Sequence, residues 1–383
     1  MRKGKFLLAT AMIPLLVISC KNNAAQDQHE CCQNRDNIIV DVPRGEQAPP
    51  ANPGQRNFGG MMPMGGTANR QRSQRPQGQG QGQAAQRPAM QMPAMQRPAQ
   101  QVRTVSLKEL SMSDPFIYPD PETKTYWLTS TGGALYKSTD LEMWTGPYNV
   151  IDLSGTWNNH GVCIEQVPRR YNVPLNQTQL LVSDKVDGPY LPLVKDSLFC
   201  LGPTDWDIID GTLYEENDTV YMVFVHEWTQ LIDGTMAYMP LSKDLTHRIA
   251  EPTTIFRASE APWSKEMNSI GEATFGMRMP GWVTDGPQMF RTETGRLGML
   301  WSSWGENRYA QGIAWSESGS IKGPWIQEEK AFRGDNSGHG MLFKTFEGQL
   351  LYSVHHDGGT GRKPEIWTVD ASGDKLILGK RIH

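Results

Sequence analysis

Three aspartates and one histidine stand at comparable places in four similar segments of the chain. The segments begin "SDPFIYPD", "IDGTLYEE", "TDGPQMFR" and "GHGMLFKT", and each continues through an apolar stretch and a turn into a second apolar stretch. The polar residues are Asp114, Asp210, Asp285 and His339. A single Asp beside Gly or Pro is common in turns, where its side chain bonds nearby backbone. Its recurrence indicates instead that these side chains converge in one pocket.

A pocket that gathers carboxylates favours acid–base chemistry. Burial and like charge raise the pKa of one carboxyl while another stays ionised. Hydrolysis of a glycosidic bond needs such a pair, because a protonated acid must serve the leaving oxygen and an ionised base must activate water. A third carboxylate can keep the pKa of the acid high and orient it. The residue types therefore predict glycoside hydrolysis.

Residues so far apart in sequence need a radial scaffold to meet. From about residue 103, short apolar runs alternate with turn residues and no helical period is sustained, which is typical of an all-β fold. A second set of segments, each a strand that ends in Ser, alternates with the first; the serines are Ser138, Ser183, Ser242 and Ser316. Repeated four-stranded units predict a β-propeller, in which the first strand of each blade lines the central channel.

The spacing of the repeats predicts five blades, one of them degenerate. The stretch between the first two acids, which contains "TWNNHGVCIEQVPRRYNVPLNQTQLLVSD", matches the other units poorly and holds too little sequence for a full hairpin. We therefore expect an all-β, five-bladed propeller over residues 103–383 with a reduced second blade.

The motifs quoted above, together with "YWLTST", "STDLEMW" and "LWSSW", resemble glycoside hydrolase family 43 over all of residues 103–383. The resemblance implies a five-bladed propeller that hydrolyses arabinose- or xylose-containing plant polysaccharides with inversion, as arabinanases, arabinofuranosidases and xylosidases do. It implies that Asp114 is the general base. It also implies that Asp210 modulates the pKa of the general acid and orients it.

The chain departs from the family pattern at the general acid. The family usually has Glu before Gly-Pro, whereas this chain has Asp285, which is shorter by one methylene. Glu227, in "VFVHEWTQ", is a second candidate for the acid, because it ends the strand that follows Asp210 and stands between His226 and Trp228. The alternative for Glu227 is a solvated acid at a strand end.

The second departure lies in the reduced blade. The family commonly has a Trp-Ala-Pro-Glu-like motif there, and this chain has "TWNNHGVCIEQ". Trp157 can keep the aromatic role, and Glu165 is the nearest counterpart of the acid.

Several further side chains are candidates for sugar or metal binding. His339 resembles the histidine that approaches an axial calcium in arabinanase-like members; the alternative is a structural or sugar-bonding role, since calcium prefers oxygen. Trp206 and Trp301 can stack on sugar or belong to the core. The candidate substrate-binding residues are Trp157, His226, Trp228, Trp263, Trp304 and His339. No other cofactor is expected.

The N-terminus predicts export. Residues 1–19 have a basic start and an apolar run too short to span a bilayer, and Ser19 precedes Cys20. This resembles a lipoprotein signal, so Cys20 is expected to carry lipid and anchor the protein in a bacterial cell envelope; the alternative is a plain cleaved signal peptide. Residues 20–102 are rich in Gln, Gly, Pro and Met without a helical or strand period, which predicts a disordered linker.

Composition excludes other classes of protein. A formal net charge of -4 and a pI near 6.1 provide no basic field for nucleic acid. No CxxC spacing is present, so a zinc site is not expected. We expect a monomer. Two other functions stay open: a lipid-anchored propeller that binds glycan but has lost catalysis, and an assembly scaffold, for which the convergent acids would have no explanation.

Overall fold

The computed structural model describes residues 17–19, 101–131, 133–151, 176–194, 200–268, 272, 278–306 and 308–383. These residues all belong to one compact unit. Most of the predicted signal peptide, Cys20, nearly all of the predicted linker, Trp157 and Glu165 lie outside the described residues.

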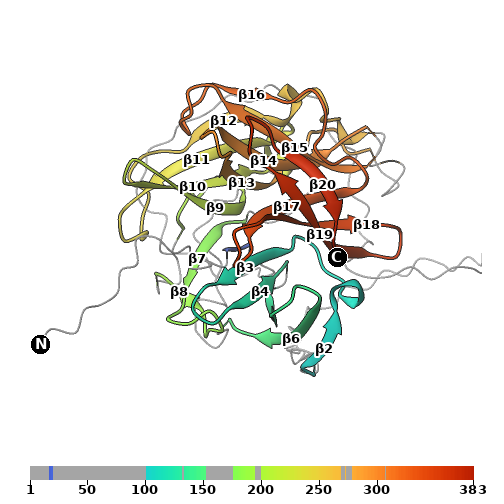
Figure 1. Ribbon diagram of the computed structural model, residues 1–383. Coiled ribbons are helices and arrows are strands. Elements are labelled where there is room, and N and C mark those ends of the chain that lie inside the picture. Colours follow the sequence, from blue (N-terminus) through green and yellow to red (C-terminus); the bar gives the residue numbers. More distant parts are fainter. Residues whose placement is uncertain are drawn as a thin grey trace, which may run out of the picture. The chain divides into compact units, whose positions relative to one another are not determined.

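Four antiparallel sheets of four or five strands form most of this unit (Figure 1). The first has the order β2-β6-β5-β4-β3, and its strands are β2 (Arg103–Ser106), β3 (Phe116–Asp120), β4 (Thr125–Thr129), β5 (Ala134–Ser138) and β6 (Met143–Asn149). The next full sheet comprises β9 (Ile208–Glu216), β10 (Thr219–His226), β11 (Thr235–Leu241) and β12 (Thr253–Arg257). It is followed by β13 (Asp285–Arg291), β14 (Leu297–Trp304), β15 (Tyr309–Ser316) and β16 (Trp325–Gln327). The last comprises β17 (Ser337–Lys344), β18 (Leu350–Asp357), β19 (Arg362–Asp370) and β20 (Ile377–Arg381).

A smaller sheet and three short helical turns whose residues are all described are also present. The small sheet has the order β1-β7-β8, with β1 at Val17–Ser19, β7 at Thr178–Val182 and β8 at Leu191–Pro192. The helical turns are η1 (Leu107–Glu109), α1 (Trp228–Leu231) and η3 (Ala258–Glu260). None of the helices in the described part of the chain is long and apolar enough to cross a membrane.

The sheets are arranged around their first strands, as the sequence predicts for a propeller. β17 contacts both β3 and β13, β13 also contacts β9, and β9 contacts β7. Figure 1 shows the successive sheets spreading outward from these strands. The prediction of an all-β propeller is therefore confirmed.

The core consists of apolar layers between neighbouring sheets. Tyr221 and Val223 of β10 share one cluster with Met299 and Trp301 of β14. Because both faces of a middle strand are covered by neighbouring blades, β14 is buried along almost its whole length and lacks the alternating polar face of a solvated strand. Packing between sheets, rather than any one sheet, therefore holds the inner strands and their side chains in place.

Candidate active site

A β-bulge with a left-handed residue recurs near the start of the inner strands. The φ angles are 58° at Asp114, 54° at Asp210, 53° at Gly286 and 54° at His339. In the last three cases the register with the next strand shifts at this point. Positive φ is uncommon for residues other than Gly, and bulges often re-aim a side chain beside an active site. A left-handed residue therefore recurs at Asp114, Asp210 and His339, and at the last two it coincides with a bulge.

The prediction that Asp285 occupies the matching position is wrong by one residue. Gly286 has the left-handed conformation in β13, and Asp285 stands one residue earlier, where its partner on β14 is Ser302. Gly338 of β17 stands at the corresponding place and pairs with His355. The repeated Asp-Gly in the sequence hides this offset, because the bulge can fall on either residue of the pair.

Asp114 lies between two imidazoles. Its Oδ1 is 3.3 Å from Nδ1 of His339 and 3.2 Å from Nδ1 of His355. The Thr131 hydroxyl donates to its Oδ2, and its own backbone N–H donates to His355 Nδ1 at 3.1 Å. Burial acts to raise the pKa of Asp114, but His339, His355 and Thr131 together hold that pKa below its ordinary value. Asp114 is therefore ionised and suited to accept a proton.

His339 is seated on the glycine of the neighbouring blade. A Cβ at Gly286 would lie 2.6 Å from His339 Cδ2, so only glycine leaves room for the ring. The backbone N–H of His339 donates to Ser302 Oγ at 2.8 Å. Burial acts to lower the pKa of His339, but Asp114, Asp210 and Asp285 raise it overall. The imidazole thus neutralises part of the charge of the three carboxylates.

Asp210 and Asp285 have the opposite electrostatic character to Asp114. Asp210 Oδ2 accepts the Gly286 N–H at 3.0 Å and is 4.0 Å from His339 Nδ1. Burial raises the pKa of Asp210. Burial and then the charge of Asp210 raise the pKa of Asp285 well above its ordinary value, with a further contribution from Glu227. The site therefore holds one carboxyl that stays ionised and another that retains its proton.

Tyr309 and His355 are site residues that the sequence reasoning missed. The Tyr309 hydroxyl donates to Asp285 Oδ2 at 2.8 Å. The Tyr309 ring is parallel to that of His355, with centroids 5.5 Å apart and planes 8° apart. Tyr309 is the first residue of β15, and His355 lies in the second half of β18. Both lie outside the repeated Asp motifs. The sequence offers one indication of His355: the His355-His356 pair stands near the end of the second strand of its sheet, as Glu227 does in its own sheet.

Glu227 follows the last residue of β10, at the end of the second full sheet where Asp210 of β9 also lies. It is the N-cap of α1, and its carboxylate accepts the Thr229 N–H at 3.4 Å. Its backbone N–H donates to the Asp207 carbonyl at 2.9 Å. It is half-buried, and its charge contributes to the raised pKa of Asp285. The structure thus brings Glu227 into the electrostatic field of the aspartates.

His226, the residue before Glu227, packs and bonds within the strand end. His226 is buried, stacks on Trp206 with centroids 3.9 Å apart, and shares a 2.8 Å hydrogen bond with Gln230 Oε1. Burial lowers the pKa of His226 to about 4, so the ring is neutral at physiological pH. Gln230 Oε1 also accepts the Asp207 N–H at 2.8 Å. His226 therefore fixes the strand end rather than presenting a free ring to sugar.

The predicted aromatic residues divide between site and core. Trp304 is partly exposed and lies edge-on to Tyr309 at 5.9 Å. Trp228 is buried in the small cluster against which Trp304 packs, so its ring offers no open face to a sugar, contrary to its prediction as a substrate-binding residue. Trp263 is 6% exposed, lies 4.7 Å from the ring of Trp301, and belongs to the core cluster between two blades. The placement of Trp263 contradicts its prediction as a substrate-binding residue, because a buried inter-blade ring has no face to offer a sugar.

The residues near His339 do not fit a bound calcium ion. His339 Nδ1 is directed at two carboxylates, and calcium prefers oxygen ligands. Within the described ranges there is no group of three or more His, Cys, Asp or Glu side chains placed to hold a metal.

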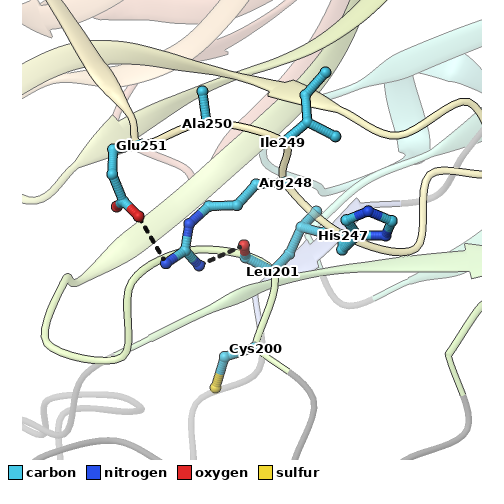
Figure 2. A pocket seen from close by; sticks show the side chains of 7 residues that line it. All are labelled: Cys200, Leu201, His247, Arg248, Ile249, Ala250 and Glu251. Carbon is cyan, nitrogen blue, oxygen red and sulfur yellow. Dashed lines mark hydrogen bonds and ion pairs between the residues drawn. The ribbon is translucent and has the colours of Figure 1, made fainter. Parts of the chain in front are cut away.

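A cavity of about 300 Å³ lies away from these residues (Figure 2). It is lined by Cys200, Leu201 and the segment His247–Glu251. Figure 2 shows Arg248 bonded to Glu251 and to the Leu201 carbonyl, both at 3.3 Å. Its one arginine is thus already paired within the wall, and no residue of the aspartate site reaches it.

Comparison with known proteins identifies the family. The model of glycosyl hydrolases family 43 matches residues 106–372. The chain belongs to this family. An endo-arabinase from Bacteroides thetaiotaomicron VPI-5482 is similar to it, with 34% identity and a TM-score of 0.59 over 68% of this chain and 95% of its own. No curated protein matches the chain.

More distant structures share the fold. An endo-1,4-beta-xylanase from Bacteroides thetaiotaomicron VPI-5482 is 19% identical, with a TM-score of 0.53 over 74% of this chain and 98% of its own. A thermostable family-43 glycoside hydrolase is 18% identical, with a TM-score of 0.55 over 71% and 94% of the two chains. This family 43 protein is a glycoside hydrolase, and the resemblance inferred from its motifs is confirmed.

Proposed function

We propose that this family 43 enzyme cleaves arabinose- or xylose-containing plant polysaccharides with inversion of configuration. The observation that carries the proposal is the pair of oppositely tuned carboxyls, Asp114 and Asp285, in one pocket. Ionised Asp114 takes a proton from water, which attacks the anomeric carbon. Protonated Asp285 delivers its proton to the leaving oxygen. Asp210 keeps the pKa of Asp285 high.

The substrate class rests on kinship within the family. The similar structure at 34% identity is described as an endo-arabinase, so arabinan is the first substrate to test. The purified propeller should be assayed on arabinan, arabinoxylan and nitrophenyl pentosides, with the anomer of the first product followed by NMR. Release of the inverted anomer supports the proposal. Binding of glycan without cleavage of any of these substrates would overturn it in favour of a non-catalytic binder.

The identity of the acid can be decided by its dependence on the leaving group. An aryl glycoside with a good leaving group needs little protonation, whereas a natural glycan needs it fully. Asp285→Asn should therefore reduce turnover of polysaccharide by about 10²- to 10⁴-fold and largely spare the aryl substrate. Glu227→Gln is the matched comparison. If only Glu227→Gln produces this signature, Glu227 is the acid and Asp285 is not.

We also propose that the small sheet is the remnant of a fifth, degenerate blade. β7 ends just before Ser183, the residue that corresponds to Ser138 and Ser316 at the ends of β5 and β15 and to Ser242 just after β11. β7 packs towards β9, and Tyr190 and Leu181 share a cluster with Trp127 of the first sheet. A crystal structure of residues 103–383 tests this proposal. A ring that closes with no strands between the first sheet and β9 would contradict it.

The N-terminal anchor is a further part of the proposal. Processing at Cys20 would remove residues 1–19, including β1, and leave residues 20–102 as the linker between lipid and propeller. Cys20→Ala should release the protein from membranes or stall its processing, as judged by fractionation and by the mass of the mature N-terminus. Unaltered recovery of the variant with membranes would refute lipidation at this residue.

A further inference from the structure

We infer that Tyr309 is a positioning residue that fixes which oxygen of Asp285 carries the catalytic proton. The inference rests on the proposed role of Asp285 as general acid. It assigns a task to a residue that touches the acid but need not touch the substrate. The hydrogen bond from Tyr309 to Asp285 Oδ2, 2.8 Å long, is the observation on which it stands.

Tyr309 is held rigidly on several sides. It is 7% exposed, and a Cβ on Gly338 would lie 2.4 Å from its Cε1, so the backbone of Gly338 rests against the ring. His355 is parallel to the ring, and Trp304 meets it edge-on at 5.9 Å. A phenol confined in this way can direct its hydroxyl at only one place. It therefore acts as a fixed donor rather than an adaptable one.

A fixed donor constrains the proton of a carboxylic acid. A protonated carboxyl has one O–H donor and one oxygen that accepts readily. Because Oδ2 of Asp285 accepts the Tyr309 hydroxyl, the proton of the acid belongs on Oδ1, and the proposed mechanism requires this oxygen to meet the leaving group. The pKa of Tyr309 is raised well above its ordinary value, first by burial and then by Asp285, so the phenol keeps the proton that it donates.

The same hydrogen bond favours departure of the proton. A hydrogen bond to an ionised oxygen is roughly twice as strong as one between neutral groups. As Asp285 gives up its proton, the bond from Tyr309 strengthens and stabilises the new carboxylate. This gain appears only on the way to the transition state, where it accelerates the reaction. It also offsets the shortness of Asp compared with Glu, because a short acid must be oriented accurately to reach its target.

Tyr309→Phe tests the inference, because it removes the hydroxyl and keeps the ring. We expect kcat on polysaccharide to fall about 10- to 100-fold with KM little changed, and kcat on an activated aryl glycoside to fall much less. Tyr190→Phe is the matched control. It removes the hydroxyl of another buried tyrosine, which donates to the Val186 carbonyl at 3.0 Å rather than to a site aspartate.

A double-mutant cycle with Asp285→Asn separates positioning from a general structural effect. If Tyr309 acts through the acid, Tyr309→Phe should cost nothing further in the Asp285→Asn background but should keep its full cost in the Glu227→Gln background. Equal costs in all backgrounds, or equal losses on both substrates, would overturn the inference. If Asp285→Asn is itself as active as wild type on glycan, the proposed acid falls and this inference with it. If Asp285→Asn loses turnover of glycan as expected but Tyr309→Phe keeps wild-type turnover, the inference about Tyr309 is wrong while Asp285 remains the acid.

Discussion

Asp114 and Asp285 are the same residue type near the starts of two inner strands, β3 and β13, yet their surroundings differ. Asp114 lies against two imidazoles and a hydroxyl, which lower its pKa despite burial. Asp285 receives a single phenol hydroxyl and faces Asp210 and Glu227, so burial and like charge raise its pKa. The comparison teaches that environment assigns the roles of base and acid, since side-chain chemistry is identical.

Removing the charge of Asp114 should have the largest effect. Asp114→Asn cannot accept a proton from water, so kcat should fall by about 10³- to 10⁴-fold on polysaccharide and on aryl glycoside alike. Stopped assays on both substrates measure this loss, and circular dichroism checks the fold.

An equal loss of kcat on both substrates is the result that distinguishes Asp114 from Asp285. Asp114→Gly suits the φ of 58° and leaves room for a small anion. Azide needs no deprotonation, so it should restore turnover of the aryl glycoside by this variant. A loss in Asp114→Asn that depends on the leaving group would reverse the two assignments.

Neutralising Asp210 should make the two carboxyls more alike. The Asp210 charge raises the pKa of Asp285, so Asp210→Asn should lower that pKa and shift the basic limb of the kcat/KM profile to lower pH. Less of Asp285 would then carry its proton at neutral pH, so activity there should fall by about 10- to 100-fold. The acidic limb, which reports Asp114, should move much less. An unshifted basic limb would show that Asp210 does not tune the acid.

The fold and the convergence of Asp114, Asp210, Asp285 and His339 could be predicted because each repeat carries its polar residue at the start of an inner strand. The offset of Asp285 could not, because Asp-Gly can place its bulge on either residue. Tyr309 belongs to a third strand and reaches the site only through the stacking of blades. Trp263 was mistaken for a sugar platform, since the layers between blades also use tryptophan.

The contact between Gly286 and the His339 ring joins the part of the site around Asp114 to the part around Asp285. Gly286→Ala would bring a methyl group against the His339 ring and force a non-glycine residue to φ 53°. We expect about a tenfold loss of kcat on all substrates as the ring moves away from Asp114, and a stability cost of about 1–2 kcal/mol. Gly295→Ala is the control for backbone strain, because its φ is 87° and nothing lies within 4 Å of the added Cβ. Equal activity in the two variants would mean that the contact between Gly286 and the His339 ring does not affect catalysis.

The smallest effect should come from Thr131, whose hydroxyl donates to Asp114 Oδ2 and helps to lower its pKa. Thr131→Val should raise the pKa of Asp114, so that the base becomes ionised only at higher pH and the acidic limb of kcat/KM shifts upward. Thr131 is exposed, so water can replace its hydroxyl, and His339 and His355 remain in place. Activity at neutral pH should therefore change less than about threefold. Thr131→Ser keeps the hydroxyl and should leave the profile where it is. A shift of the basic limb instead would mean that Thr131 acts on the acid, and the contrast between Asp114 and Asp285 would have to be redrawn.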